Sequence, residues 1–273
     1  MDEVYLTSRK NPLVSLVASL KLKKNRDAEG LFRADGVKLL CEAAACRAGF
    51  FAVLVKKSSA EKLLPLPGNV RPERGVFILD DGVFEKITEE KSPEGVVSVI
   101  KYLDTVRKSD TIINNAHFGI GPEEGVIALE SVRDPGNVGT VLRSAAAFGF
   151  ETVIMSSDCA DVYSSRAVRA AMGALFSRRV ITVDDLPGAL SVLRESGRRI
   201  CAAALTPDSV PLQDTVPDRR DIFVIGNEGH GLSGAVLAQA SLKVRIPMLS
   251  GPGIESLNAA VAASVIMYER KRC

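Results

Sequence analysis

The stretch Arg133–Phe150, RDPGNVGTVLRSAAAFGF, sets one arginine in a helical segment made almost wholly of small and apolar residues. The Pro-Gly pair is typical of a turn, and Asn137 is a residue type that often caps a helix N-terminus. Arg143 then falls on the second helical turn. A cation near a helix N-terminus gains nothing from the helix dipole, and the neighbouring side chains are too small to cover it. The stretch therefore predicts a capped helix that presents one arginine.

Around this stretch, the second half of the chain alternates apolar runs of strand length with helical patterns. Strands are expected at 125–131, 150–157, 178–183, 198–205, 221–228 and 242–248, and helices at 137–148, 165–176, 186–196, 233–240 and 256–270. Runs that are apolar on both faces indicate a parallel sheet covered by helices on both sides. Ligands of such sheets bind beyond the carboxyl ends of the strands. This rule selects four segments rich in Gly, Ser, Asn or Pro: SVRDPGNVG (131–139), LTPDS (205–209), GNEGHGLS (226–233) and MLSGPGIESLN (248–258).

The first half of the chain has a different texture. Its patterns predict helices at 12–24 and 37–49 and strands at 30–36, 50–57, 76–81 and 95–102, which together make a small α/β or α+β domain. Residues 107–124 have no sustained period and carry several Asn and Gly residues, as linkers do. We therefore expect one domain at 1–106, a linker at 107–124 and a second domain at 125–273.

Composition narrows the class of protein. The chain has 273 residues, of which 46% are hydrophobic and 25% charged, as in ordinary globular proteins. It contains neither an apolar run long enough to cross a membrane nor a signal-peptide pattern, so we expect a soluble, cytoplasmic protein without a membrane partner. Five dispersed cysteines without a C-x-x-C pair argue against a disulfide framework or a zinc site. Two histidines argue against a histidine metal centre or a Ser-His-Asp triad.

Charge is concentrated near the N-terminus. The net charge of +2 is too small to indicate nucleic-acid binding by itself. Between Arg9 and Arg33, however, seven basic residues stand against two acidic ones. On charge alone a solvated helix face is the favoured interpretation, and RNA contact is the alternative.

The loop motifs are weak signals when taken singly. Neither a G-x-G-x-x-G nor a G-x-x-x-x-G-K-[ST] motif is present, which argues against a dinucleotide fold and a P-loop NTPase. Glu228 lies between glycines directly after a buried-type strand, which suggests that something approaches the backbone closely there. His230 in the same loop is either a polar turn residue or a proton carrier. Ser256 is the expected N-cap of the last helix, and Asn258 is a mediocre helix former in its first turn.

Together and in this order, three blocks resemble the SpoU/TrmH family of the SPOUT superfamily, the S-adenosyl-L-methionine (AdoMet)-dependent RNA ribose 2′-O-methyltransferases. The blocks are RDPGNVGTVLRSAAAFG, FVIGNEGHGLS and IPM…ESLNAAVAAS. The resemblance implies an α/β fold, in which a parallel-sheet domain with a trefoil knot follows a smaller L30e-like α/β substrate-binding domain. It also implies AdoMet as cofactor, RNA as partner (ribosomal favoured over transfer RNA), a homodimer, and no metal. The alternative is a non-catalytic RNA-binding or ribosome-assembly protein on the same scaffold.

The resemblance also implies roles for individual residues. Contacts to AdoMet are expected from Leu205, Thr206, Gly226, Ile246, Met248 and Leu257. The catalytic set is expected to comprise Asn137, Arg143, Glu228, Ser256 and Asn258. Arg143 is either the general base or an electrostatic stabiliser, and we favour the second because a guanidinium normally stays protonated. Glu228 would orient it through an ion pair. Contacts to RNA are expected from Arg9, Lys10, Lys23, Lys24, Arg26, Arg33, Arg166 and Arg169. The segment Leu249–Ile254 is longer than in the family.

Overall fold

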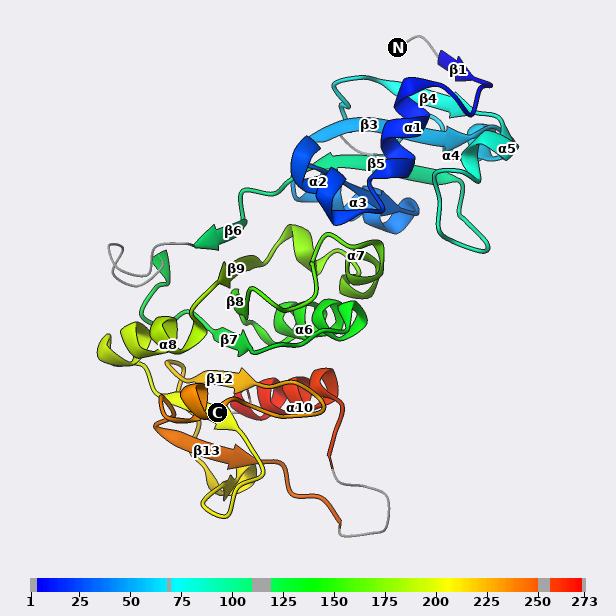
Figure 1. The fold of residues 1–273 in the computed structure, drawn as a ribbon. Coiled ribbons are helices and arrows are strands. Elements are labelled where there is room, and N and C mark those ends of the chain that lie inside the picture. Colours follow the sequence, from blue (N-terminus) through cyan, green and yellow to red (C-terminus); the bar gives the residue numbers. More distant parts are fainter. Residues whose placement is uncertain (1–3, 68–69, 110–118, 250–255, 272–273) are drawn as a thin grey trace. The chain divides into compact units, whose positions relative to one another are not determined.

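The computed structural model describes residues 4–67, 70–109, 119–249 and 256–271. The chain divides into two compact units (Figure 1). Unit 1 comprises Met1–Asp104 and Asp161–Ser177, and unit 2 comprises Thr105–Ala160 and Arg178–Cys273. A segment that lies between two strands of unit 2 in the sequence thus packs with the N-terminal residues. The domains 1–106 and 125–273 remain a prediction about how the chain is organised.

Unit 1 is built on a mixed five-stranded sheet in the order β1-β4-β3-β5-β2. Its strands are β1 (Val4–Leu6), β2 (Leu31–Asp35), β3 (Phe50–Lys56), β4 (Val76–Leu79) and β5 (Val96–Lys101). β5 runs antiparallel to both of its neighbours, whereas β1, β4 and β3 are parallel. The four strands that the sequence predicts are present, because each is an apolar run that the helices bury. β1 is an additional edge strand whose Val4 and Tyr5 are exposed.

The helices of unit 1 correct the expected single helix at 12–24. α1 (Pro12–Ser19) is capped by Asn11 and ends before a turn, and α2 (Lys23–Glu29) begins after it. Arg26 makes this break stable, since its guanidinium donates to the carbonyls of Leu20 and Lys21 at 2.8 and 2.9 Å. The remaining helices of this unit are α3 (Val37–Ala45), η1 (Lys57–Ser59), α4 (Ala60–Leu63), α5 (Asp81–Phe84), α7 (Ser165–Ala171) and η3 (Ala174–Phe176).

The segment Asp161–Ser177 packs into unit 1 through rings and charges. Tyr163 stacks on Tyr102 with ring centroids 4.1 Å apart and contacts Phe32 at 4.6 Å. The Tyr163 hydroxyl accepts a hydrogen bond from the backbone N–H of Leu103, and burial raises the pKa of this hydroxyl. The expected helix at 165–176 is interrupted because Met172 adopts a left-handed conformation.

Unit 2 contains an eight-stranded sheet in the order β11-β13-β10-β12-β7-β8-β9-β6. All of its neighbouring strands are parallel. The six predicted strands are present as β7 (Val126–Leu129), β8 (Thr152–Ser156), β9 (Arg179–Val183), β10 (Ile200–Ala203), β12 (Ile222–Ile225) and β13 (Leu242–Arg245). The expectation of a parallel sheet is therefore confirmed. Two edge strands join it, β6 (Val106–Ser109), of which residues 107–109 were expected to belong to the linker, and β11 (Val210–Pro211).

Helices cover both faces of this sheet, as the runs of buried residues require. One face packs on α8 (Leu186–Glu195) and α9 (Gly234–Leu237) through a cluster that includes Leu190 and Val236. α6 (Pro135–Phe148) and α10 (Ala259–Lys271) lie side by side (Figure 1) and are joined by a 2.7 Å hydrogen bond between Ser144 and Ser264. η4 (Leu212–Asp214) is a single turn.

Both expected helix caps in unit 2 are wrong by a few residues. Asp134, not Asn137, caps α6, because its carboxylate accepts a hydrogen bond from the Asn137 N–H at 3.0 Å. Asn258, not Ser256, caps α10, because its side-chain oxygen accepts from the N–H groups of Ala260 and Val261 at 2.9 and 3.2 Å. The side chain of Asn137 is therefore not used as a helix cap, whereas the side-chain oxygen of Asn258 is.

Two expectations depend on residues 250–255, which lie outside the ranges that the structure describes. The trefoil knot is set by the path of the chain between β13 and α10, which includes residues 250–255, so the knot remains a prediction. The same holds for most of the long segment Leu249–Ile254. Within the described ranges, no helix has the length and apolar character that a membrane span requires.

Candidate functional site

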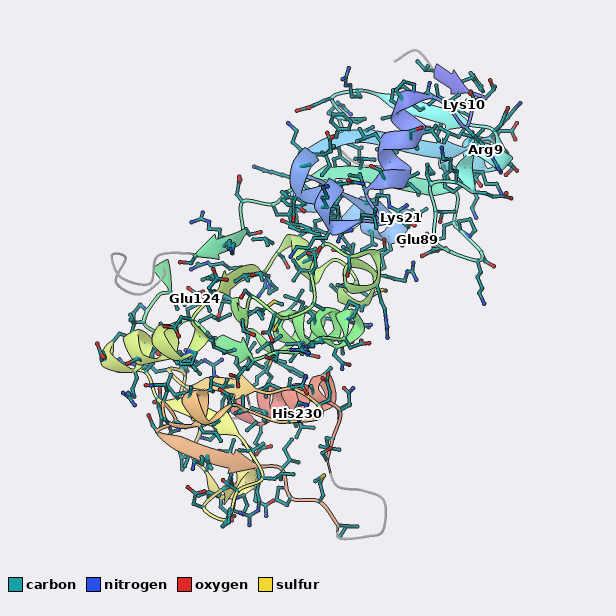
Figure 2. All side chains as sticks on the ribbon, viewed as in Figure 1. Arg9, Lys10, Lys21, Glu89, Glu124 and His230 are labelled. Carbon is teal, nitrogen blue, oxygen red and sulfur yellow. The ribbon has the colours of Figure 1, made fainter. Side chains whose placement is uncertain are left out.

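A cavity of about 610 Å³ opens at the carboxyl ends of β10, β12 and β13. Its walls come from three loops that follow these strands and from the start of α10. All six residues expected to contact a cofactor lie in these walls: Leu205, Thr206, Gly226, Ile246, Met248 and Leu257. Glu228, His230 and Ser256 line the same cavity, and Figure 2 labels His230 in the turn after β12. Described residues of three of the four segments selected by the strand-end rule therefore line one cavity, whereas the fourth segment, 131–139, contributes no wall.

The wall formed by residues 226–231 is a tight turn that the loop builds for itself. Asn227 and Gly231 exchange backbone hydrogen bonds of 3.0 and 2.9 Å. A side chain at Gly226 would lie 2.4 Å from the carbonyl carbon of Gly231, so the close approach inferred from the sequence is that of the loop's own backbone. The Asn227 amide donates to the Ser131 carbonyl at 2.9 Å, and its oxygen accepts from the Gly229 N–H at 2.8 Å. Sequence reasoning missed Asn227, although its place between Gly226 and Glu228 pointed to it.

The opposite wall, Ala204–Thr206, is held by Ser209. The buried Ser209 hydroxyl donates to the Ala204 carbonyl at 2.7 Å and accepts from the Thr206 N–H at 3.2 Å. The Ser209 carbonyl accepts a hydrogen bond from the Arg245 guanidinium on β13. Nothing in the sequence distinguished Ser209 from an ordinary turn serine, because its role depends on the pairing of β11 with β13.

Three of the expected catalytic residues form one polar chain beside the cavity. The Asn258 amide donates to the Asn137 side-chain oxygen at 3.0 Å. The Asn137 amide in turn donates to the Glu228 carboxylate at 2.5 Å. This network joins the N-termini of α10 and α6 to the turn after β12. The orientation of each amide is therefore set by its neighbours, which leaves the Asn137 group fixed at the edge of the cavity.

Arg143 and Ser256 are not part of this network. Arg143 lies on α6 about 9 Å along the helix axis from Asn137, by the usual rise per residue, and is exposed. Among the described residues, no side chain or carbonyl forms a hydrogen bond or ion pair with its guanidinium. The expected ion pair with Glu228 is thus absent from that part of the chain, since Glu228 instead accepts from Asn137. Ser256 is exposed and lines the cavity.

A second polar cluster lies next to this network, at the ends of β7 and β8. Asp158 accepts hydrogen bonds from the hydroxyls of Ser131 and Ser156 at 2.6 and 2.7 Å. Arg133 approaches the same carboxylate at 3.4 Å. Partial burial acts to raise the pKa of Asp158, but the hydrogen bonds from the two serines and Arg133 outweigh it and hold the pKa below its usual value. Asp158 is therefore ionised at neutral pH.

The cysteines and acidic groups do not assemble into a ligand set in the described ranges. No group of three or more His, Cys, Asp or Glu side chains there could hold a metal ion. Cys41, Cys46, Cys159 and Cys201 form no disulfide bond, and burial raises the pKa of Cys201 to about 12. The absence of a metal requirement remains a prediction.

Two residues expected to contact RNA are instead part of the interior of unit 1. Arg26 and Arg33 are each 4% exposed. Arg26 forms an ion pair with Asp161 at 2.5 Å in addition to its two carbonyl contacts. Arg33 donates to the Ile87 carbonyl and to Ser165 and pairs with Glu89 at 3.2 Å. The prediction is wrong for both arginines, because their guanidinium groups are committed to buried partners.

The other six basic candidates are on the surface of unit 1. Lys10, Lys23 and Lys24 are exposed, and Figure 2 labels Lys10 beside Arg9. Arg9 donates to the Gly82 carbonyl at 2.6 and 2.9 Å. Arg166 and Arg169 are exposed on α7, where Arg169 pairs with Glu90 at 2.9 Å. All six remain candidates for RNA contact.

Comparisons with known proteins agree with this arrangement. An uncharacterized tRNA/rRNA methyltransferase of Synechocystis is 30% identical over 99% of this chain and 94% of its own length. The 23S rRNA (guanosine(2553)-2′-O)-methyltransferase RlmP of Bacillus subtilis is 27% identical over 96% of this chain and 97% of its own. The structure of an AdoMet-bound rRNA methyltransferase from Sinorhizobium meliloti matches with a TM-score of 0.80 at 27% identity, covering 99% of this chain and 98% of that one.

Two family profiles match separate ranges of the sequence. The MRM3-like substrate binding domain matches residues 11–98. The SpoU rRNA methylase family matches residues 124–268, which contain the cavity, the polar network and Arg143. The chain therefore belongs to the SpoU rRNA methylase family, and it is an AdoMet-dependent RNA methyltransferase.

Proposed function

We propose that this protein transfers the methyl group of AdoMet to a ribose 2′-hydroxyl of ribosomal RNA, with transfer RNA as the second candidate substrate. The observation that carries the proposal is the chain Asn258–Asn137–Glu228 at the edge of the cavity. It fixes an amide and a carboxylate where a substrate hydroxyl can approach a bound cofactor. The specificity named for RlmP supports ribose methylation and favours ribosomal RNA.

The cavity fits AdoMet in size and chemistry. Its volume of about 610 Å³ lies within the usual range for small-molecule sites. Apolar side chains such as Ile225, Ile246 and Leu257 suit a purine ring, whereas Thr206 and Glu228 offer polar partners. When bound, AdoMet supplies an electrophilic methyl group on a sulfonium. We assign its contacts to Leu205, Thr206, Gly226, Ile246, Met248 and Leu257.

Arg143 is proposed to stabilise the negative charge that develops on the 2′-oxygen as the hydroxyl loses its proton. A guanidinium keeps its proton at neutral pH, so electrostatic stabilisation suits it better than general-base catalysis. Its lack of a partner among the described residues leaves it available for this charge. Asn137, held by Glu228 and Asn258, and Ser256 would position the ribose.

We also propose a homodimer formed through α6 and α10. Val261, Val265 and Tyr268 are 48%, 37% and 54% exposed, and their spacing places them along one side of α10. Arg143 does not line the cavity of its own chain, so a second copy on this helix pair would complete its surroundings. Light scattering should give twice the monomer mass, and Val265→Glu should give the monomer mass. A monomeric wild-type protein would refute this part.

The surface of unit 1 is proposed to bind RNA through Arg9, Lys10, Lys23, Lys24, Arg166 and Arg169. Contacts to phosphate supply most of the sequence-independent affinity for nucleic acid. The lack of disulfide bonds among the described cysteines and an RNA substrate support the proposal of a cytoplasmic location.

Tritium transfer from labelled AdoMet to ribosomal RNA of a strain lacking the gene tests the proposal. Label is expected on that RNA, and mapping of 2′-O-methyl groups identifies the nucleotide. A 2′-deoxy substitution at that nucleotide should abolish the label, and label that persists would indicate methylation of a base. AdoMet binding without transfer to either class of RNA would favour the non-catalytic alternative.

A further inference from the structure

The carboxyl edge of the unit 2 sheet is poor in positive charge. Its described loops are 130–134, 157–160, 184–185, 204–209, 226–231 and 246–249, and 256–258 precede α10. They contain seven acidic residues: Glu130, Asp134, Asp158, Asp184, Asp185, Asp208 and Glu228. Arg133 is the single lysine or arginine in these described loops, and Arg245, which ends β13 and lines the cavity, is bound to the Ser209 carbonyl. An RNA strand that brings a ribose to this edge also brings negatively charged phosphates. The acidic loops would repel these phosphates unless a cation at the edge binds them.

The backbone around Arg133 is pinned from several sides. The Ser131 carbonyl accepts from Asn227, and the Ser131 N–H donates to Ser156 at 2.8 Å. The Val132 carbonyl accepts from the Ala160 N–H at 2.9 Å, and Asp134 caps α6. The backbone of Arg133 is therefore held in place between Ser131, which contacts Asn227 in the cavity wall, and Asp134, which contacts Asn137 of the polar network.

The side chain of Arg133, in contrast, is loosely held. It is 72% exposed, and its contact with Asp158 is 3.4 Å long with the carboxylate 45% exposed. An exposed ion pair of this kind contributes little to stability. Asp158 does not depend on it, because Ser131 and Ser156 also donate to its oxygens. A phosphate can therefore replace the carboxylate at low cost.

From these observations we infer that Arg133 binds an RNA phosphate beside the target ribose, and that Asp158 is its partner in the free enzyme. The inference rests on the proposed function and adds a substrate contact to the same site. Arg133 would then govern the affinity for RNA, whereas Arg143 acts on the reacting oxygen. Asp158 lowers that affinity, because RNA must displace it.

The test compares Arg133→Gln with Asp158→Asn, which should act in opposite directions. Arg133→Gln is expected to raise the KM for ribosomal RNA about tenfold, to leave kcat within about twofold, and to reduce the slope of log affinity against log salt by about one. Asp158→Asn keeps the size of the side chain and should lower the KM. In the double variant the KM should equal that of Arg133→Gln, and Arg133→Lys should restore most of the affinity.

Arg220→Gln is the matched control, because Arg220 forms a similar exposed pair with Glu123 at 3.2 Å but precedes β12, at the other end of the strands. It should leave the KM unchanged. The dissociation constant of AdoMet, measured by calorimetry, should be the same in all variants and reports that the site is intact. A KM that rises equally in Arg133→Gln and Asp158→Asn would overturn the inference in favour of a structural pair.

The inference and the proposed function can fail separately. If the wild-type protein transfers methyl groups to the 2′-oxygen but Arg133→Gln leaves the KM and the salt slope unchanged, only the inference is wrong. If the wild-type protein transfers no methyl group, the proposed function is wrong. In that case the salt dependence of ribosomal RNA binding by wild type and Arg133→Gln still decides whether Arg133 contacts phosphate.

Discussion

Two buried arginines of unit 1 and two exposed arginines of unit 2 have opposite environments. Arg26 and Arg33 stand in the most basic part of the sequence, yet both are buried and bound to carbonyls and carboxylates. Arg133 and Arg143 stand alone among small, acidic or apolar residues, and both are exposed. Density of charge along the chain therefore does not identify the cations available to a ligand. Whether the folded chain supplies partners for the guanidinium is the better guide.

The largest effect should come from removing a buried arginine. Arg26→Ala leaves Asp161 and two carbonyls without their partner, and breaking such a buried pair typically costs about 3–5 kcal/mol of stability. Urea unfolding measures the loss. Lys24→Ala, an exposed change on the same helix, should stay within about 0.5 kcal/mol. Equal stability of the two variants would remove the contrast between buried and exposed cations.

Removing an exposed arginine should affect turnover and leave the fold intact. Arg143→Ala is expected to lower kcat by about 10²- to 10³-fold, the usual loss for a group that stabilises a developing oxyanion. Single-turnover transfer measures it, and the AdoMet dissociation constant should not change. Arg194→Ala, an exposed arginine on α8, is the control and should keep full activity. Full turnover by Arg143→Ala would contradict the proposed mechanism.

The turn after β12 should be sensitive to one added methyl group. In Gly226→Ala the new Cβ would meet the Gly231 backbone at 2.4 Å, so the cavity wall must move, at a cost of about 1–3 kcal/mol. Calorimetry should detect weaker AdoMet binding. Gly234→Ala has no atom within 4 Å of the added group and should bind normally. Normal binding by both variants would show that this wall does not hold the cofactor.

The smallest expected effect separates the two roles of Asn258. Asn258→Ala removes the cap of α10, which should cost about 1 kcal/mol of stability, and removes the contact with Asn137. Asn258→Asp keeps a capping oxygen but cannot donate to Asn137, so we expect near-normal stability with reduced kcat. Thermal unfolding and transfer rates measure the pair of effects. If both variants lost activity only in proportion to their loss of stability, the sole role of Asn258 would be to cap α10.

Several features could be predicted because they depend on local pattern. The central strands β7, β8 and β12 of the parallel sheet are buried on both faces, and continuous apolar runs report such burial directly. The ends of the helices were harder to predict from the sequence. In RDPGN both Asp134 and Asn137 can cap, and the preference of proline for the first helical position selects Asp134. The break at Ser19 was not predictable, because it is stabilised by Arg26, which lies in the next helix.

The sequence by itself determined the α/β class, the order of the strands along the chain and the loops in which the site lies. These follow from hydrophobic periodicity and from the rule that ligands bind at the carboxyl ends of parallel strands. Only the tertiary structure decided which polar groups meet. Glu228 and Asn258 reach Asn137 from 91 and 121 residues away, and Asp161 reaches Arg26 from 135 residues away. Such contacts decide whether a charge is buried or available, because burial depends on neighbours that are distant along the chain.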